Sequence, residues 1–181
     1  MYQHLPKEKR KKILLLSDDF RTSSGIGTMA KELVVGTCHH FNWVNLGAAM
    51  NHPEAGKMLD VSNSVQDFTG VLDAEVRVIP YNGYGDQEVV RKLMDAEKPD
   101  AVMIFTDPRY WVWLFDMERE IRSKVPLLYL SIWDSNPAPL WNGSFYESCD
   151  ALFCISKNTK FITKEILEQR SSVNMVDLDE K

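Results

Sequence analysis

The sequence has few cysteines, no long apolar run and no excess of basic residues, and each shortage excludes a class of protein. Only three of the 181 residues are cysteine, an odd and sparse set that does not suggest a disulfide framework. No apolar stretch approaches the roughly 18 residues that a membrane-spanning helix needs. The formal net charge is −5, which argues against a nucleic-acid-binding body. We therefore expect a cytoplasmic globular protein with no transmembrane segment and no nucleic-acid partner.

Basic residues gather at the start of the chain. Residues 7–12 contain five basic side chains and one acid, which leaves 16 basic against 25 acidic residues in the rest of the chain. We expect residues 1–11 to form a solvated lead-in, with weak contact to an anionic membrane as the alternative. One domain follows over residues 12–169. The tail, residues 170–181, has no apolar periodicity and is expected to fray.

The most structured pattern in the sequence is a strand, a polar loop and a helix between Lys12 and Val35. The continuous apolar run 13–16 predicts a strand buried on both faces, as in a parallel sheet. A polar loop and Gly25-Ile26-Gly27 follow, and glycine lets a backbone approach a ligand closely. Apolar residues from 26 to 34 then recur at helical spacing, with Ser23 or Ser24 as the cap. The start of this helix can receive a phosphate group.

Strand and helix patterns alternate through the rest of the chain. This alternation predicts an α/β fold: a doubly wound, mostly parallel, Rossmann-like sheet with helices on both faces. Residues 47–70 are weakly patterned and are expected to pack irregularly around the sheet edge. The aromatic residues from Tyr110 to about Arg122 have helical spacing, which favours core packing over a sugar-binding surface. The further expected strands are 41–46, 75–80, 100–106, 125–131 and 150–155, and the further helices begin at Asp86, Tyr110 and after Ser156.

Ligands of such sheets bind beyond the carboxyl ends of the strands. Three loops are expected there: Ser17–Gly27, Asp107–Tyr110 and Trp133–Asn142. The last loop is unusual, because two prolines fix an extended path along which two tryptophans and polar side chains are presented. Loops of this kind commonly line a site.

The glycine loop fits the pattern G-x-G-x-x-G/A and looks like the cofactor loop of short-chain dehydrogenases. Val44-Asn45-Leu46, at the end of the second strand, offers no acid for a ribose. None of the six tyrosines is followed by lysine four residues later, so the catalytic pair of that family is missing. A P-loop motif is absent as well. Cys38-His39-His40 cannot converge on one metal ion and has no second pair at ligand spacing, so we expect no metal site.

As a whole, the sequence resembles the N-terminal half of glycosyltransferases with the GT-B fold, family 4 in particular. The resemblance covers roughly residues 12–168 and lies in the order and spacing of four segments. These segments are Ile13–Asp19 with Gly25, Gly27 and Ala30–Leu33; Lys98–Asp107; Pro126–Asp134; and Tyr146–Ser156. One position departs from the family, because Trp133 stands where the family usually has histidine before the aspartate.

The resemblance implies a retaining, hexosyltransferase-type enzyme that moves a sugar from a nucleotide-sugar donor to an acceptor. It implies no tightly bound cofactor and assigns chemistry to a cleft between two halves. The donor-binding half carries a Glu-x7-Glu pair, which this sequence lacks, so we expect that half to act in cis or in trans and this chain to be inactive alone. The implied catalytic residues are Asp134 and Asp107, the residues facing the donor diphosphate are Gly25, Ile26, Gly27 and Thr28, and the substrate-binding residues are Asp19, Trp133, Asn136, Trp141 and Asn142.

Each of these residues also has a structural interpretation. The glycines can serve close strand–helix packing alone, the aspartates can cap turns, and the tryptophans can anchor their loop. The alternative function is therefore a stand-alone Rossmann-like binding or scaffold protein without catalysis, and an NAD(P)-dependent dehydrogenase-like protein is the third hypothesis.

Overall fold

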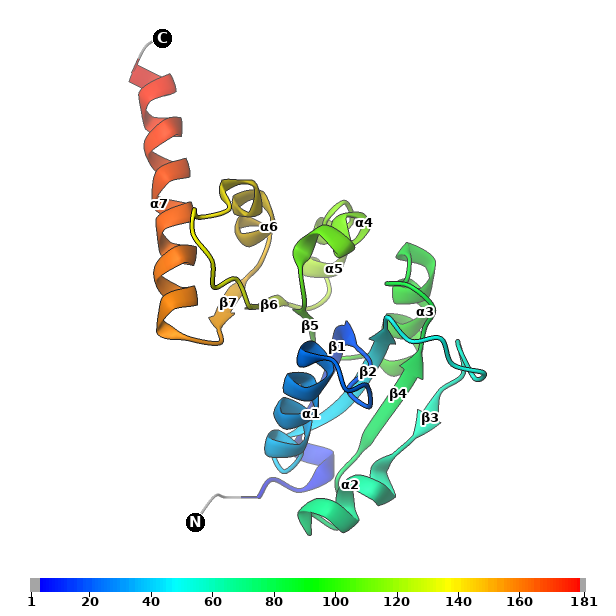
Figure 1. Cartoon of the computed structure of the whole chain (residues 1–181). Helices are drawn as coiled ribbons and strands as arrows, with labels where there is room; N and C mark the ends of the chain where they lie inside the picture. The colour runs from blue at the N-terminus through cyan, green and yellow to red at the C-terminus, as the bar shows by residue number, and fades with distance from the viewer. Residues whose placement is uncertain (1–3, 180–181) are drawn as a thin grey trace.

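A seven-stranded sheet runs through the middle of the protein, with helices on both faces (Figure 1). The structure is a computed structural model that describes residues 4–179, and side chains up to residue 170. The strands are β1 (Lys11–Asp18), β2 (Phe41–Ala48), β3 (Leu59–Asp60), β4 (Val76–Pro80), β5 (Ala101–Phe105), β6 (Leu127–Ser131) and β7 (Ala151–Cys154). The α-helices are α1 (Gly25–Thr37), α2 (Ser62–Thr69), α3 (Gln87–Glu97), α4 (Val112–Phe115), α5 (Glu118–Arg122), α6 (Gly143–Glu147) and α7 (Lys157–Asp179). Short 3₁₀ turns occupy Lys7–Lys9, Pro108–Trp111 and Leu140–Asn142.

The strand order is β3-β4-β2-β1-β5-β6-β7, and every neighbouring pair is parallel except β3 with β4. On one side of β1 lie β2, β4 and the edge strand β3, and on the other side lie β5, β6 and β7 in chain order. This is the doubly wound Rossmann order, so the predicted fold class is confirmed. The order reverses between β1 and β5, and the loops after these two strands therefore flank the point where such sheets bind ligands.

The sheet separates two apolar clusters, which explains the unbroken apolar run of the first strand. Leu14 and Leu16 pack toward the layer that contains α3 to α7, whereas Ile13 and Leu15 pack toward α1 and α2. Successive side chains of a strand point to opposite faces. A strand in the centre of a three-layer sandwich must therefore be apolar at every position.

Two helix starts follow the sequence pattern. The Ser24 hydroxyl accepts a hydrogen bond from the Gly27 N–H, and the Asp86 carboxylate accepts one from Val89 N–H. These caps use groups that the first turn of a helix would otherwise leave unpaired.

Other expectations were wrong. Residues 47–70 are not irregular throughout, because they contain β3 and α2; only Val65 of α2 is buried, so the helix has almost no apolar stripe. The expected helix 110–122 is divided into a 3₁₀ turn, α4 and α5. The aromatic pattern there does serve the core, since Trp111, Phe115 and Met117 are buried. The helix α7 extends from Lys157 to Asp179, and fraying of the tail beyond Arg170 stays a prediction.

The basic lead-in is exposed at Lys7, Lys9 and Lys11, and most of its basic side chains form ion pairs. The Arg10 side chain is buried and pairs with Asp73, while Lys7 pairs with Glu75. Lys11 and Lys12 pair with Asp100 and Glu97, which lie just ahead of β5. Four of the five basic side chains therefore pair with acids elsewhere in the chain, and those of Lys7 and Lys11 stay 48% and 71% exposed.

Candidate functional site at the strand ends

The candidate site lies at the carboxyl edge of the sheet, on both sides of the β1–β5 switch point. We call it the switch-point site. It consists of Asp18, Ser24, Tyr84, Asp107, Arg109, Tyr110, Trp133 and Asp134.

The glycine loop places fewer groups in this site than the sequence suggests. A Cβ atom on Gly27 would lie 2.2 Å from the Thr22 Oγ1 and 2.8 Å from the Thr22 carbonyl oxygen, so this glycine serves close packing of its own loop. The N–H of Gly27 is bonded to Ser24 Oγ and that of Thr28 to the Ser24 carbonyl. Gly25 has open space around it, and among the described residues neither its N–H nor that of Ile26 has a hydrogen-bond partner. Only these two N–H groups remain for a ligand.

Thr28 lies on a different surface. It lines a hollow of about 590 Å³ between α1 and α2, together with Arg21, Lys31 and Phe68. It does not line the cavity beside Asp107.

Asp18, and not the expected Asp19, is the carboxylate that α1 and β1 present to the site. Asp19 is fully buried and bonds to Arg21, and its side chain packs where a Cβ on Gly47 would stand. Asp18 is 8% exposed, and its Oδ2 accepts a hydrogen bond of 2.8 Å from the Ser24 hydroxyl. Its buried Oδ1 has no hydrogen-bond partner of good geometry, although the Tyr84 hydroxyl lies close enough for a hydrogen bond with the Asp18 carboxylate to contribute to the raised pKa of Tyr84. A buried carboxylate oxygen without a donor is costly, and a ligand hydroxyl would satisfy it.

Two tyrosines connect the β1 side of the site with the β5 side. The rings of Tyr84 and Tyr110 are stacked, with centroids 4.3 Å apart and planes at 3°. Burial and the negative charge of Asp18 raise the pKa of Tyr84 to about 12, and Tyr110 and Asp107 add to this shift. The Tyr84 hydroxyl therefore stays protonated at neutral pH and remains a hydrogen-bond donor.

On the β5–β6 side a small cavity of about 200 Å³ joins three of the residues that the sequence singled out. Asp107, Trp133 and Asp134 line it together with Pro108, Tyr129, Ile132 and Ser135. Burial alone would raise the pKa of Asp107, but hydrogen bonds from Arg109 outweigh it and lower that pKa. The Arg109 guanidinium also lies 5.9 Å from the centre of the Trp133 ring. Asp134 is exposed at the mouth, where the Ser135 hydroxyl donates to its carboxylate.

No family model, curated protein or solved structure matches this chain.

The loops after β1 and β5 contain the same local arrangement of an aspartate and an arginine. Asp19 and Arg21 follow β1, and Asp107 and Arg109 follow β5; in each case the aspartate accepts the N–H of the arginine two residues later and also holds its guanidinium. Both arginines next to the switch point are thus neutralised by their own loop. Their side chains offer a phosphate group less than an unpaired guanidinium would.

The Trp133–Asn142 loop is only partly accessible. Trp141 is 55% exposed and meets Trp133 edge-on, with ring centroids 5.9 Å apart. Asn136 is exposed. Asn142 is fully buried, with its amide donating to the Tyr146 hydroxyl and its Oδ1 unpartnered. Asn142 is therefore enclosed by the protein in this structure, and its role in substrate binding stays a prediction.

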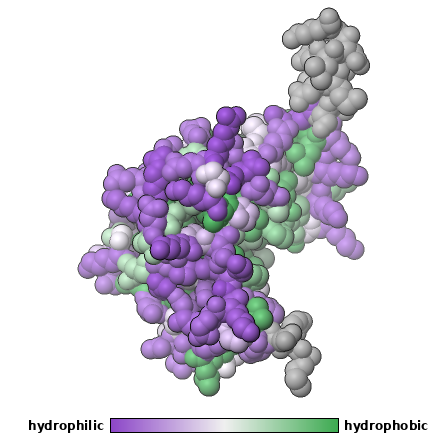
Figure 2. All heavy atoms as spheres, turned by 180° about the vertical axis from the view of Figure 1, so that it is seen from behind, coloured by the Kyte–Doolittle hydropathy of each residue, from purple (hydrophilic) through white to green (hydrophobic). Residues whose placement is uncertain are grey.

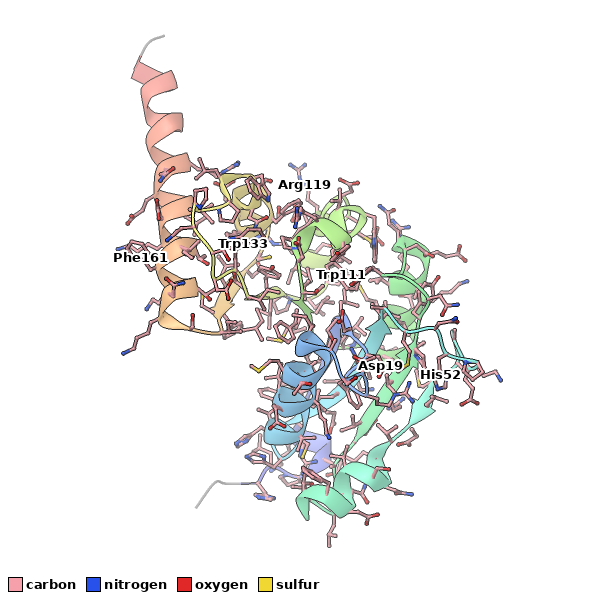
Figure 3. The ribbon with its side chains drawn as sticks, viewed as in Figure 1. Asp19, His52, Trp111, Arg119, Trp133 and Phe161 are labelled. Atoms are coloured by element: carbon pink, nitrogen blue, oxygen red, sulfur yellow. The ribbon has the colours of Figure 1, made fainter. Side chains whose placement is uncertain are left out.

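Figure 3 shows how the labelled residues divide along the edge. Trp133 lies on the side of α6 and α7, whereas Asp19 lies beside β2, where its backbone N–H bonds to the Ala48 carbonyl. The residues expected to act together therefore form two groups, with the stacked tyrosines between them.

Sequence reasoning missed Asp18, Tyr84 and Tyr110 as site residues. Asp18 is the last residue of β1, and Tyr84 lies in a turn between Gly83 and Gly85, both of which have positive φ. The available signal was position alone, because each residue lies two to four residues after a predicted strand; Asp18 and Tyr110 fall within loops that the sequence places at the strand ends. Their convergence depends on which strands are neighbours, and the sequence pattern does not give that order.

The helices that the structure describes include none long and apolar enough to cross a membrane.

Proposed function

We propose that this chain is the acceptor-side half of a glycosyltransferase, which transfers a sugar from a nucleotide-sugar to an acceptor when a donor-binding half completes the cleft. The observation that carries the proposal is the composition of the switch-point site. An unpartnered carboxylate oxygen of Asp18, the ionised Asp107 and three aromatic rings surround the place where a Rossmann sheet binds its ligand.

This composition suits an uncharged, hydroxyl-rich ligand. Carboxylates accept hydrogen bonds from hydroxyl groups, and aromatic rings cover the apolar face of a sugar ring. The cavity of about 200 Å³ at Asp107 and Trp133 is smaller than a drug-sized pocket. It has room for one ring of a larger acceptor.

The same composition suits a diphosphate poorly. Arg21 and Arg109 are each held by an aspartate, and Asp18 adds negative charge close to the start of α1. Helix dipole and free N–H groups at Gly25 and Ile26 would have to bind the phosphates against this charge. The donor phosphates therefore need cationic groups from the other half, which supports inactivity of the chain alone.

Ligand-observed NMR tests the proposal. The chain would be titrated with a panel of uncharged mono- and disaccharides and, separately, with UDP and GDP. We expect saturation-transfer signals from at least one sugar and binding of the nucleotides at least about tenfold weaker. Tighter binding of nucleotides than of every sugar would refute the acceptor-side assignment.

A variant locates the site. Asp18→Asn keeps an oxygen that accepts from Ser24 but removes the charge, and it is expected to weaken sugar binding roughly tenfold, as loss of one charged hydrogen bond does. Asp116→Asn, at an exposed position between α4 and α5, is the matched control and should leave binding unchanged. Equal effects of both changes would contradict the location.

The second candidate is a stand-alone binding module that uses the same site without chemistry, and the two neutralised arginines favour it. Sugar binding alone does not distinguish the two functions. Transfer of a labelled sugar after addition of a donor-binding half would establish catalysis, and its absence with every donor half tried would favour the binding module.

A further inference from the structure

The outermost strand, β7, is an unprotected sheet edge. It has a neighbour, β6, on one side only, and its sequence Ala-Leu-Phe-Cys contains no charge and no proline. Phe153 is 47% exposed and the following Ile155 is 43% exposed. Proteins normally protect edges by charged side chains, proline, bulges or short strands. The opposite edge follows this rule, because β3 has two residues and ends in Asp60.

A groove accompanies this edge. It has a volume of about 760 Å³ and lies between β7 and the outer side of α7. Leu152 and Cys154 form its apolar floor, and the α7 residues along it are Lys160, Thr163, Lys164, Leu167 and Glu168. Phe161 of α7 is 64% exposed and projects away from the rest of the protein (Figure 3). In Figure 2 hydrophobic side chains gather beside the base of this helix.

We propose that this edge joins a second copy of the chain, with the two β7 strands antiparallel across a two-fold axis and the two α7 helices lying antiparallel in the grooves. Two identical strands related by a two-fold axis can pair in this way, since each supplies the N–H and C=O groups that the other lacks. The result is one continuous sheet through both copies. The exposed Phe153 side chains then approach each other across the new strand pair.

Charge on α7 favours this occupant and this orientation. Along the described part of the helix, Lys157, Lys160 and Lys164 come first and Glu165 and Glu168 follow. Lys164 pairs with Glu168 within the helix, and the later Arg170 is paired with Glu147 of α6. Two antiparallel copies set the basic half of one helix against the acidic half of the other, whereas a parallel arrangement would set like charges together. A surface that is complementary to itself when reversed is what a two-fold interface requires.

Sedimentation velocity over roughly 5 to 500 μM chain tests the proposal, with the mass checked by light scattering. We expect a monomer–dimer equilibrium. Phe153→Asp, which places a charge on the edge, should weaken the dimer at least about tenfold and leave the melting temperature close to that of the parent. Phe68→Asp is the matched control, because Phe68 is 72% exposed on α2, far from β7 in the strand order.

Charge reversal tests the antiparallel helices. Lys160→Glu reverses a charge that lines the groove without breaking an ion pair of the described residues, and it should weaken the dimer. Lys164→Glu would also break the Lys164–Glu168 pair within α7 and does not isolate the contact between copies. Three outcomes would each overturn the proposal. The chain could stay monomeric at every concentration, a dimer could be disrupted by Phe68→Asp and not by Phe153→Asp, or the β7 edge could pair only with a different protein. The test is independent of sugar binding, so its failure and failure of the proposed function are distinguishable.

Discussion

Alanine substitutions at the two glycines at the start of α1, Gly25 and Gly27, are expected to have different effects on stability, although the two positions are only two residues apart. A Cβ atom at Gly27 would stand 2.2 Å from Thr22 Oγ1, 2.8 Å from the Thr22 carbonyl and 2.9 Å from the Asp19 carbonyl. Contacts under 3.0 Å to backbone atoms cannot be relieved by a rotamer change alone. At Gly25 an added Cβ meets nothing within 4 Å.

We expect Gly27→Ala to destabilise the domain and Gly25→Ala to leave it unchanged or slightly stabilised. Overpacking costs about 1–3 kcal/mol, and the displaced Thr22 hydroxyl loses its hydrogen bond to the Asp19 carbonyl, worth about 1 kcal/mol. Alanine regains up to about 1 kcal/mol of helix propensity over glycine. The net loss is about 1–3 kcal/mol, or roughly 3–10 °C in melting temperature for a domain of this size.

Thermal melts and urea unfolding of both variants measure this difference. Thr22→Ala combined with Gly27→Ala should recover part of the loss, because the 2.2 Å contact disappears while the two carbonyl contacts remain. Equal stability of Gly27→Ala and the parent would refute the packing role, and the loop would then have room for a ligand at Gly27. If the folded Gly27→Ala variant binds sugars as the parent does, the glycine serves stability alone.

Three further predictions concern charge and activity. Burial and Asp18 raise the pKa of Tyr84 to about 12. The stability that the protonated Tyr84 contributes is therefore complete below the unfolded pKa of about 10 and is lost as the pH rises toward 12. The urea midpoints of the parent and Tyr84→Phe should converge over this pH range, and a constant difference between the two midpoints would contradict the prediction. Hydrogen bonds from Arg122 and the Leu127 N–H lower the pKa of Asp150. Asp150→Asn should therefore lower the melting temperature by roughly 2–4 °C at pH 7. The difference in melting temperature between the parent and this variant should disappear as the pH falls below about 4. The chain alone should transfer no sugar in a radiolabelled assay, because groups that stabilise a departing nucleoside diphosphate are expected on the other half; turnover by this chain would refute that division.

The sequence by itself determined the positions of helices and strands wherever burial requires apolar residues at a regular spacing. The apolar runs of β1 and β5 have to be central strands, since no other position in a soluble α/β protein buries every side chain. Ser24 and Asp86 mark helix starts because their side chains bond the first free N–H groups. The helix within residues 47–70 was not predicted, because α2 has only eight residues and buries only Val65, which leaves a short pattern with few apolar positions.

Tertiary structure decided which of the candidate residues are accessible. Gly27 and Asp19 have the residue types of a binding loop. Thr22, however, occupies the space beside Gly27, and the Asp19 side chain is packed against Gly47 and paired with Arg21. Asp18 and Tyr84 gained importance only through neighbours distant in sequence.

The order of the strands explains the difference. Local pattern fixes where a strand ends, but the order β4-β2-β1-β5-β6 fixes which strand ends meet. That order also leaves β7 with a neighbour on one side only, so the exposed edge at Phe153 is a property of the sheet and not of the four residues that form it.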